Sequence, residues 1–199
     1  AWVATAISSA QAQRPADPLA AGRQQLADNR FADALSSFQE AARRDSSNVT
    51  VWRGMAIALH RLERYPEALS VLDRALALAP GDFVVRYSRG LALAELGRFA
   101  EAVAEFDSAM VLRPGFAPAL TERGSARLSL GQIAGAREDF GRSLAADSNY
   151  IWPRYYRGIA AIAAGHYPEA IVDFDAVVAK EGLLSAQLWR WVAYRLGAR

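Results

Sequence analysis

A period of 34 residues is the feature that most constrains this chain. Shifting the 199-residue sequence by 34 positions superimposes five segments without a gap, namely RFADALSSFQEA, RYPEALSVLDRA, RFAEAVAEFDSA, QIAGAREDFGRS and HYPEAIVDFDAV, which begin at Arg30, Arg64, Arg98, Gln132 and His166. The corresponding windows are 15–48, 49–82, 83–116, 117–150 and 151–184. Self-similarity at this spacing predicts a repeat protein in which each window forms one supersecondary unit.

Each window is predicted to contain two helices joined by a tight turn. In the third window, small and aromatic residues recur at steps of three and four and therefore share one helical face: Phe99, Ala102, Phe106 and Ala109. Gly97 precedes them and supplies the backbone freedom at which the previous helix ends. Because one hairpin cannot bury its apolar face alone, the hairpins must stack on their neighbours in sequence order.

Three columns of the repeat predict how the helices pack. Small residues recur on the first helix (Gly22, Ala56, Gly90, Gly124 and Gly158) and on the second (Ala34, Ala68, Ala102, Ala136 and Ala170). They allow two helix backbones to approach closely. A column of large residues is expected to fill the space between one hairpin and the next: Phe38, Leu72, Phe106, Phe140 and Phe174.

The third window resembles the tetratricopeptide repeat family most fully, through Tyr87, Gly90, Gly97, Phe99, Ala102, Phe106, Ala109 and Pro114. The resemblance implies an all-α fold, a right-handed superhelix of helical hairpins whose first helices line a concave groove. It also implies a non-catalytic scaffold that binds a peptide or protein segment in that groove.

Residues 185–199 are expected to form a capping helix or half repeat, with Leu188, Trp191 and Val192 facing back onto the array. Two interpretations of its aromatic residues stay open. Either they are buried against the fifth hairpin, or they form an exposed patch for a homodimer or another partner. The second interpretation makes the chain an assembly subunit that docks through this helix.

Composition and motifs give no support for catalysis. The chain has no cysteine, and its two histidines, His60 and His166, lie three windows apart without a metal-binding motif. No nucleophile elbow and no phosphate-binding glycine loop is present. We therefore expect no enzyme activity, no metal and no cofactor.

A column of arginines, Arg89, Arg123 and Arg157, suggests at first a basic stripe for phosphate. Acids recur in the second helix of the same windows, at Glu105, Asp139 and Asp173, so each arginine has a candidate partner on its own hairpin. With a net charge of only +2, nucleic-acid binding is not expected.

The groove is the candidate functional site. The family resemblance implies that its stripe lies one residue after the small packing residue of each first helix, with flanking positions beside it. Its basic and apolar members are Arg23, Arg53, Ile57, His60, Arg61, Tyr87, Leu91, Trp152, Tyr155, Ile159 and Trp189. An extended segment with an acidic end near the arginines and an apolar remainder would suit this surface.

The first residues resemble the end of an export signal. The triplet Ala10-Gln11-Ala12 has the small-x-small form accepted by signal peptidase, which predicts a mature chain from about Gln13 in the periplasm or envelope of a bacterium. The alternative interpretation is that residues 1–14 are a disordered leader of a longer protein, and the alternative location is the cytoplasm. No apolar run approaches the length of about 20 residues needed to cross a bilayer.

Overall fold

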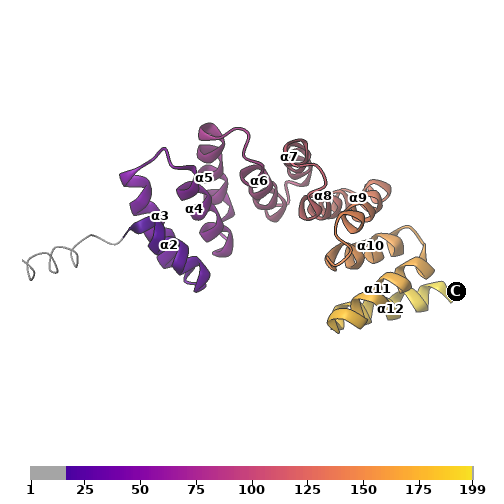
Figure 1. Cartoon of the computed structure of the whole chain (residues 1–199). Coiled ribbons are helices and arrows are strands. Elements are labelled where there is room, and N and C mark those ends of the chain that lie inside the picture. The colour runs from indigo at the N-terminus through magenta and orange to yellow at the C-terminus, as the bar shows by residue number, and fades with distance from the viewer. Residues whose placement is uncertain (1–16, 199) are drawn as a thin grey trace, which may run out of the picture. The chain divides into compact units, whose positions relative to one another are not determined.

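The computed structural model describes residues 17–198, and its regular elements there are all α-helices (Figure 1). They are α2 (Pro18–Ala27), α3 (Phe31–Arg44), α4 (Val49–Arg61), α5 (Tyr65–Leu78), α6 (Phe83–Glu95), α7 (Phe99–Leu112), α8 (Ala117–Ser129), α9 (Ile133–Ala146), α10 (Trp152–Ala163), α11 (Tyr167–Glu181) and α12 (Leu184–Gly197). The all-α solenoid class is confirmed. Within the described helices, none is long and apolar enough to span a membrane.

The helices pair into hairpins, and the tight turns follow the repeat. The second helices α3, α5, α7, α9 and α11 begin at residues 31, 65, 99, 133 and 167. Two residues before each of them, the backbone has a positive φ, at Asn29, Glu63, Gly97, Gly131 and Gly165. This left-handed residue lets the chain reverse direction between the two helices. It explains why glycine occupies the position in the last three hairpins.

Glu63 is the turn residue whose side chain fits this conformation least well. Its φ is 59°, in a region that costs a residue with a Cβ roughly 1–2 kcal/mol. We expect Glu63→Gly to raise the free energy of unfolding by about 1 kcal/mol, part of the gain being offset by the entropy of glycine in the unfolded chain. Urea unfolding measures the change. Asn29→Gly is the matched control and should gain less, because asparagine tolerates this region; a loss of stability in Glu63→Gly would contradict the argument.

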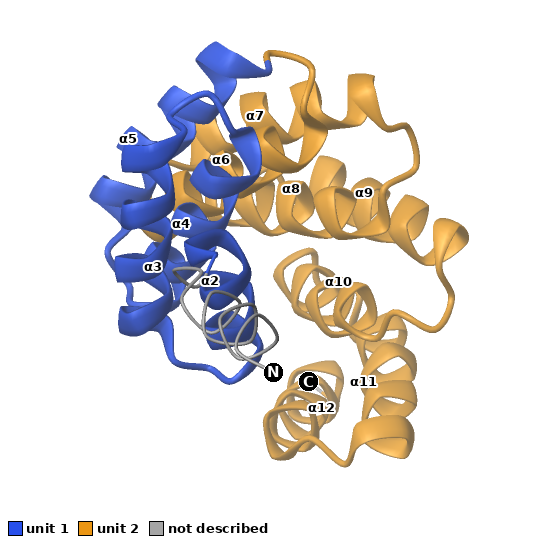
Figure 2. Cartoon of the chain, turned by 60° about the vertical axis from the view of Figure 1, so that its left-hand side comes forward, with its two compact units in different colours: residues 1–79 blue, residues 80–199 orange. Residues whose placement is uncertain are grey.

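The chain divides into two compact units, residues 1–79 with α2–α5 and residues 80–199 with α6–α12 (Figure 2). Within each unit, every helix packs on the next helix in the chain. First helices also contact the following first helix, in the pairs α2–α4, α6–α8, α8–α10 and α10–α12. Within each unit, the backbones of successive second helices lie farther apart than those of successive first helices, and α9 and α11 meet through side chains, where Arg137 donates to Glu169. The first helices are therefore the more closely spaced layer, and we call their exposed side the inner face of each unit.

The glycine column packs on the phenylalanine of the same hairpin. A Cβ placed on Gly90 would lie 2.5 Å from Cε1 of Phe106, and one on Gly124 would lie 2.6 Å from Cε1 of Phe140. The expectation that the large column fills the space between hairpins is therefore incomplete. Phe38 shows both contacts, because Gly54 of the next hairpin approaches it as closely as Gly22 of its own. Glycine thus stands on the first helix in each hairpin whose second helix carries this phenylalanine.

The prediction for the C-terminal helix is wrong in its orientation. The buried residues of α12 are Ala186 and Ala193, while Leu188 and Trp191 are 59% and 61% exposed. Two alanines seven residues apart let α12 pack closely on α11 and α10. The large side chains consequently point away from the array, and of the three only Val192 is half-buried.

The leader predicted for residues 1–14 and the predicted cleavage after Ala12 lie outside the described residues. They stay predictions, as do the exact limits of the five windows.

Candidate functional site

Three of the expected groove residues meet in unit 1. Arg23 on α2 and Arg53 and Ile57 on α4 line a hollow of about 350 Å³, whose floor includes Phe38 and Gly54. Ile57 is 46% exposed, although it is large and apolar. The hollow therefore combines an apolar floor with two guanidinium groups, a composition that suits an acidic or polar group attached to an apolar chain.

His60 and Arg61 lie at the turn end of α4. The Arg61 guanidinium lies 4.9 Å from the ring centroid of Phe31, and the His60 ring meets Tyr65 edge-on at 5.3 Å. Phe31 and Tyr65 begin the second helices α3 and α5. These two groove candidates therefore contact hairpin turns and are not part of the hollow formed by Arg23, Arg53 and Ile57.

Unit 2 carries an aromatic surface on its first helices. Trp152 and Tyr155 lie edge-to-face at 6.1 Å, and Tyr155 and Tyr156 at 5.5 Å. Core phenylalanines support this cluster from behind, because Tyr155 packs on Phe174 and Tyr156 stacks on Phe140. We define the aromatic surface as Tyr87, Trp152, Tyr155 and Tyr156 of the first helices together with Tyr150 from the connection before α10. Its rings cover core with one side, and each remains at least partly exposed to solvent.

The other three candidates of unit 2 lie on three different helices. Leu91 is half-buried on α6, and Trp189 is exposed on α12. Ile159 on α10 packs against the buried cluster around Phe174, next to Tyr155. Of these three, Ile159 is therefore the one that the structure brings together with the aromatic surface.

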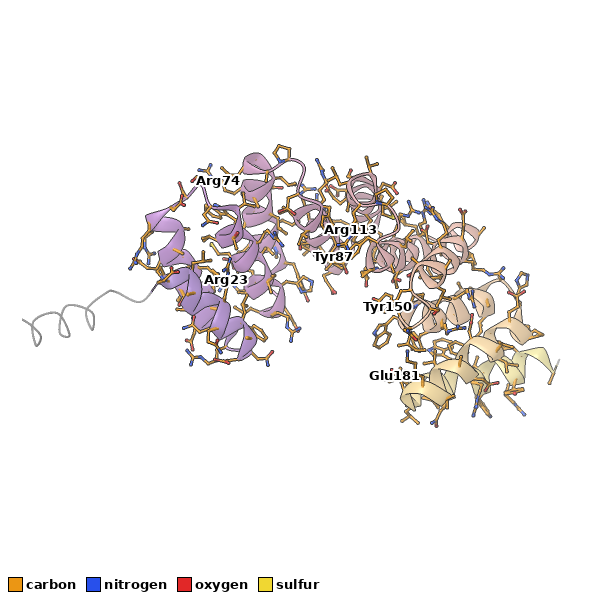
Figure 3. All side chains as sticks on the ribbon, viewed as in Figure 1. Arg23, Arg74, Tyr87, Arg113, Tyr150 and Glu181 are labelled. Atoms are coloured by element: carbon orange, nitrogen blue, oxygen red, sulfur yellow. The ribbon has the colours of Figure 1, made fainter. Side chains whose placement is uncertain are left out.

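An acid that the sequence analysis did not select lies beside the aromatic surface. Burial on α8, followed by the nearby charge of Glu95, raises the pKa of the Glu122 carboxyl. Burial and then the charge of Glu122 raise the pKa of Tyr150 to about 12, and the same two causes raise the pKa of Tyr87 and of Tyr156. Figure 3 shows Tyr87 and Tyr150 on the same side of unit 2. The Glu122 carboxylate thus lies within electrostatic reach of three tyrosine hydroxyls.

Glu122 differs from the other acids by lacking a partner. Within residues 17–198 it is the one glutamate or aspartate that is not exposed and makes no hydrogen bond or ion pair. By contrast, Glu105 accepts from Arg89 Nη1 at 2.7 Å, and Asp173 accepts from Arg157 Nε at 2.7 Å. The predicted pairing of the arginine column is confirmed, with Arg123 Nε donating to Asp139 at 2.9 Å. These arginines orient hairpins and leave Glu122 uncompensated.

The unpaired state of Glu122 makes stability depend on pH. Because its pKa is raised in the folded chain, its contribution to stability is fully present below the usual value of 4.5 and is lost as the pH rises through the raised value. We expect Glu122→Gln to be more stable than the wild type at pH 7. The two proteins should converge as the pH falls below about 4.5.

Thermal unfolding measured from pH 4 to pH 8 tests this expectation. Glu138→Gln removes an exposed acid of the neighbouring helix α9 and controls for the loss of one charge. A Glu122→Gln protein less stable than the wild type at pH 7 would show that the carboxylate has a favourable partner.

Among the described residues, no group of three histidine, cysteine, aspartate or glutamate side chains could hold a metal ion. The groups that converge on the inner faces are arginines in unit 1 and tyrosines, a tryptophan and carboxylates in unit 2. These side chains can bind a ligand through charge, hydrogen bonds and contacts with aromatic rings.

Family models identify the repeat. Two models, each described as a tetratricopeptide repeat, match this chain, the first over residues 19–83 and 121–182 and the second over residues 55–114. The first alone covers more than half of the sequence. The chain belongs to the tetratricopeptide repeat family. The search of curated proteins found no match.

Solved structures of tetratricopeptide repeat proteins share the fold. PilW, a type IV pilus biogenesis factor, has a TM-score of 0.83 at 22% identity, over 90% of this chain and 84% of its own. MamA from Desulfovibrio magneticus RS-1 has a TM-score of 0.74 at 23% identity, over 83% of this chain and 96% of its own. YrrB, described as a tetratricopeptide repeat protein with an unusual peptide-binding site, has a TM-score of 0.69 at 18% identity, over 92% of this chain and 95% of its own. At these identities the likeness concerns the fold.

Proposed function

We propose that this tetratricopeptide repeat protein is a non-catalytic scaffold that binds an extended segment of a partner protein on the inner faces of its units. Repeats of this family generally mediate protein interaction. The observation that carries the proposal is the concentration of accessible apolar and aromatic groups on the first helices, namely Ile57 above its hollow and the aromatic surface of unit 2. Aromatic and arginine side chains are the residues that most often anchor a protein partner.

Substituting one anchor in each unit tests the proposal. We expect Arg53→Ala combined with Tyr155→Ala to weaken partner binding by at least about tenfold, since an anchor residue contributes about 2 kcal/mol or more. Affinity capture from the native cell extract identifies the partner, and calorimetry with the purified partner measures the change. The control is Val172→Ser on the second helix α11, where the side chain is 66% exposed. Unchanged binding by the double variant would refute inner-face binding.

Self-association through α12 is the second candidate. Leu184, Leu188 and Trp191 recur at steps of four and three, and all three are exposed, so α12 carries an apolar stripe. We propose that this stripe is covered by a second copy or by another subunit. Light scattering of the purified protein tests it: a dimer converted to a monomer by Trp191→Asp supports an assembly role, and a monomeric wild type excludes the homodimer.

We further propose that the protein is exported to the periplasm or envelope, on the pattern around Ala10-Gln11-Ala12. Sequencing the N-terminus of the protein from its native cells tests this, because a start at Ala1 or upstream of it would contradict cleavage after Ala12.

A further inference from the structure

The inner face of unit 2 combines accessible aromatic rings with an uncompensated carboxylate. Glu122 on α8 makes no hydrogen bond or ion pair within residues 17–198, and Glu95 on α6 lies close enough to act on it electrostatically. Glu95 is exposed and likewise makes none there. Two first helices therefore hold acids beside the aromatic surface, in a chain whose other half-buried acids are compensated by arginines or by helix caps.

The rings beside these acids are held in fixed positions. Trp152 is 43% exposed and packs against Tyr155 and Tyr156 at 6.1 and 6.5 Å. Tyr87 is supported by Phe106 at 5.9 Å and by Phe116 at 5.3 Å. Because core side chains support the rings, a ligand that binds here meets an ordered surface and loses little free energy in arranging it.

The charge of this surface selects among possible ligands. An acidic group would be repelled by both glutamates, and an apolar group would further desolvate a carboxylate that has no partner. A cation would be attracted by the carboxylates and by the electron-rich faces of the tyrosine and tryptophan rings. Charge complementarity therefore favours a cationic group.

We propose that the aromatic surface, with Glu122 and Glu95, is a recognition site for a lysine or arginine side chain in the extended segment of the partner protein. This inference rests on the proposed scaffold function and deepens it, because it assigns the chemistry of one partner residue. The basic side chain takes the position of the missing partner of Glu122. The rest of the segment contributes contacts along the neighbouring first helices, which is why a tethered side chain binds here better than a free cation.

Selection from a random peptide library displayed on phage tests the site with the full-length protein as bait. We expect the wild type to select peptides with lysine or arginine enriched at one fixed position. In the best peptide, replacing that arginine by the neutral isostere citrulline should weaken binding by about tenfold or more. Glu122→Gln should weaken binding of the arginine peptide by a similar factor and should discriminate little between arginine and citrulline.

Two further variants separate the charge from the rings and from general effects. Trp152→Leu keeps the carboxylates and removes one exposed ring, so it should weaken binding of the arginine peptide, but by less than Glu122→Gln does. Glu138→Gln on α9 should leave the affinity of the protein for the arginine peptide unchanged. Because glutamine matches glutamate in shape and Glu122 has no bond to lose, the Glu122→Gln protein is expected to fold, which circular dichroism checks.

The possible failures are distinguishable. Selected peptides without an enriched basic position, or an arginine peptide bound equally by wild type and Glu122→Gln, would overturn the cation site and leave the scaffold function standing. If the selected peptides bound to the second helices and not to the first helices, the inner face would not be the binding surface. Recovery of no binding peptide would contradict the proposed scaffold function.

Discussion

Replacing Asp139 by alanine is expected to lower the free energy of unfolding by about 3–5 kcal/mol. Asp139 is fully buried on α9 and accepts hydrogen bonds from Arg123 Nε at 2.9 Å and from Arg127 Nη1 at 2.8 Å. Its removal leaves two guanidinium groups without their shared carboxylate, and Arg123 is itself buried. Arg123 keeps Asp107 as a partner, but it loses the buried carboxylate that accepts from Nε and Nη2. The large cost is that of a buried charge that has lost most of its compensation, since an intact buried pair contributes much less than its removal suggests.

Urea unfolding of the purified variants measures this effect. Asp175→Ala is the matched control, because the Asp175–Arg190 pair has a similar distance of 2.8 Å but lies at the surface. It should cost no more than about 1 kcal/mol. A loss below about 1 kcal/mol in Asp139→Ala would mean that the pair does not orient the hairpin of α8 and α9.

Replacing Phe140 by alanine is expected to cost a similar amount, about 3–5 kcal/mol. The ring is fully buried, lies against Gly124 and stacks on Tyr156 of the next hairpin. Its loss leaves a cavity between two hairpins that rigid helices cannot fill by small shifts. The urea midpoint should fall accordingly, and a change below about 1.5 kcal/mol would contradict the account of the core.

Gly124→Ala tests the same contact from the other side. Its Cβ would lie 2.6 Å from Phe140, so the variant should lose about 1–3 kcal/mol by overpacking. The second repeat shows how the conflict is avoided, because it has Ala56 and Leu72 at the two positions. Gly124→Ala combined with Phe140→Leu copies this pair and should cost less than the sum of its single changes.

The repeating parts of the fold could be predicted from the sequence because the same residue pattern occurs in several windows, and each window checks the interpretation of the others. The glycine and phenylalanine columns, the turn glycines and the pairing of arginines with acids recur at 34 residues. A misassignment in one window would conflict with the others. For α12 the apolar pattern was the available guide, and it favoured burial of Leu188 and Trp191. The buried side is instead the one that allows the closest approach, with Ala186 and Ala193.

The candidate site could be predicted only in part. Arg23, Arg53 and Ile57 share one repeat position or lie one turn apart, and the structure brings them together. Glu122 was passed over because its neighbours do not follow the period. Tyr150 precedes α10 in the connection from α9, and Glu95 lies at the end of α6, so their approach to Glu122 depends on how successive hairpins stack.

The central claim is that partner segments bind on the first helices. Its most direct test is photo-crosslinking between the full-length protein and the peptide that it selects. A photoreactive amino acid replaces one residue of the protein at a time, and the adduct with the peptide is detected. We predict adducts from Ile57 and Trp152, which are exposed on the first helices α4 and α10, and none from Val111 and Val172, which are exposed on the second helices α7 and α11. Adducts from the second helices with none from the first would contradict the account.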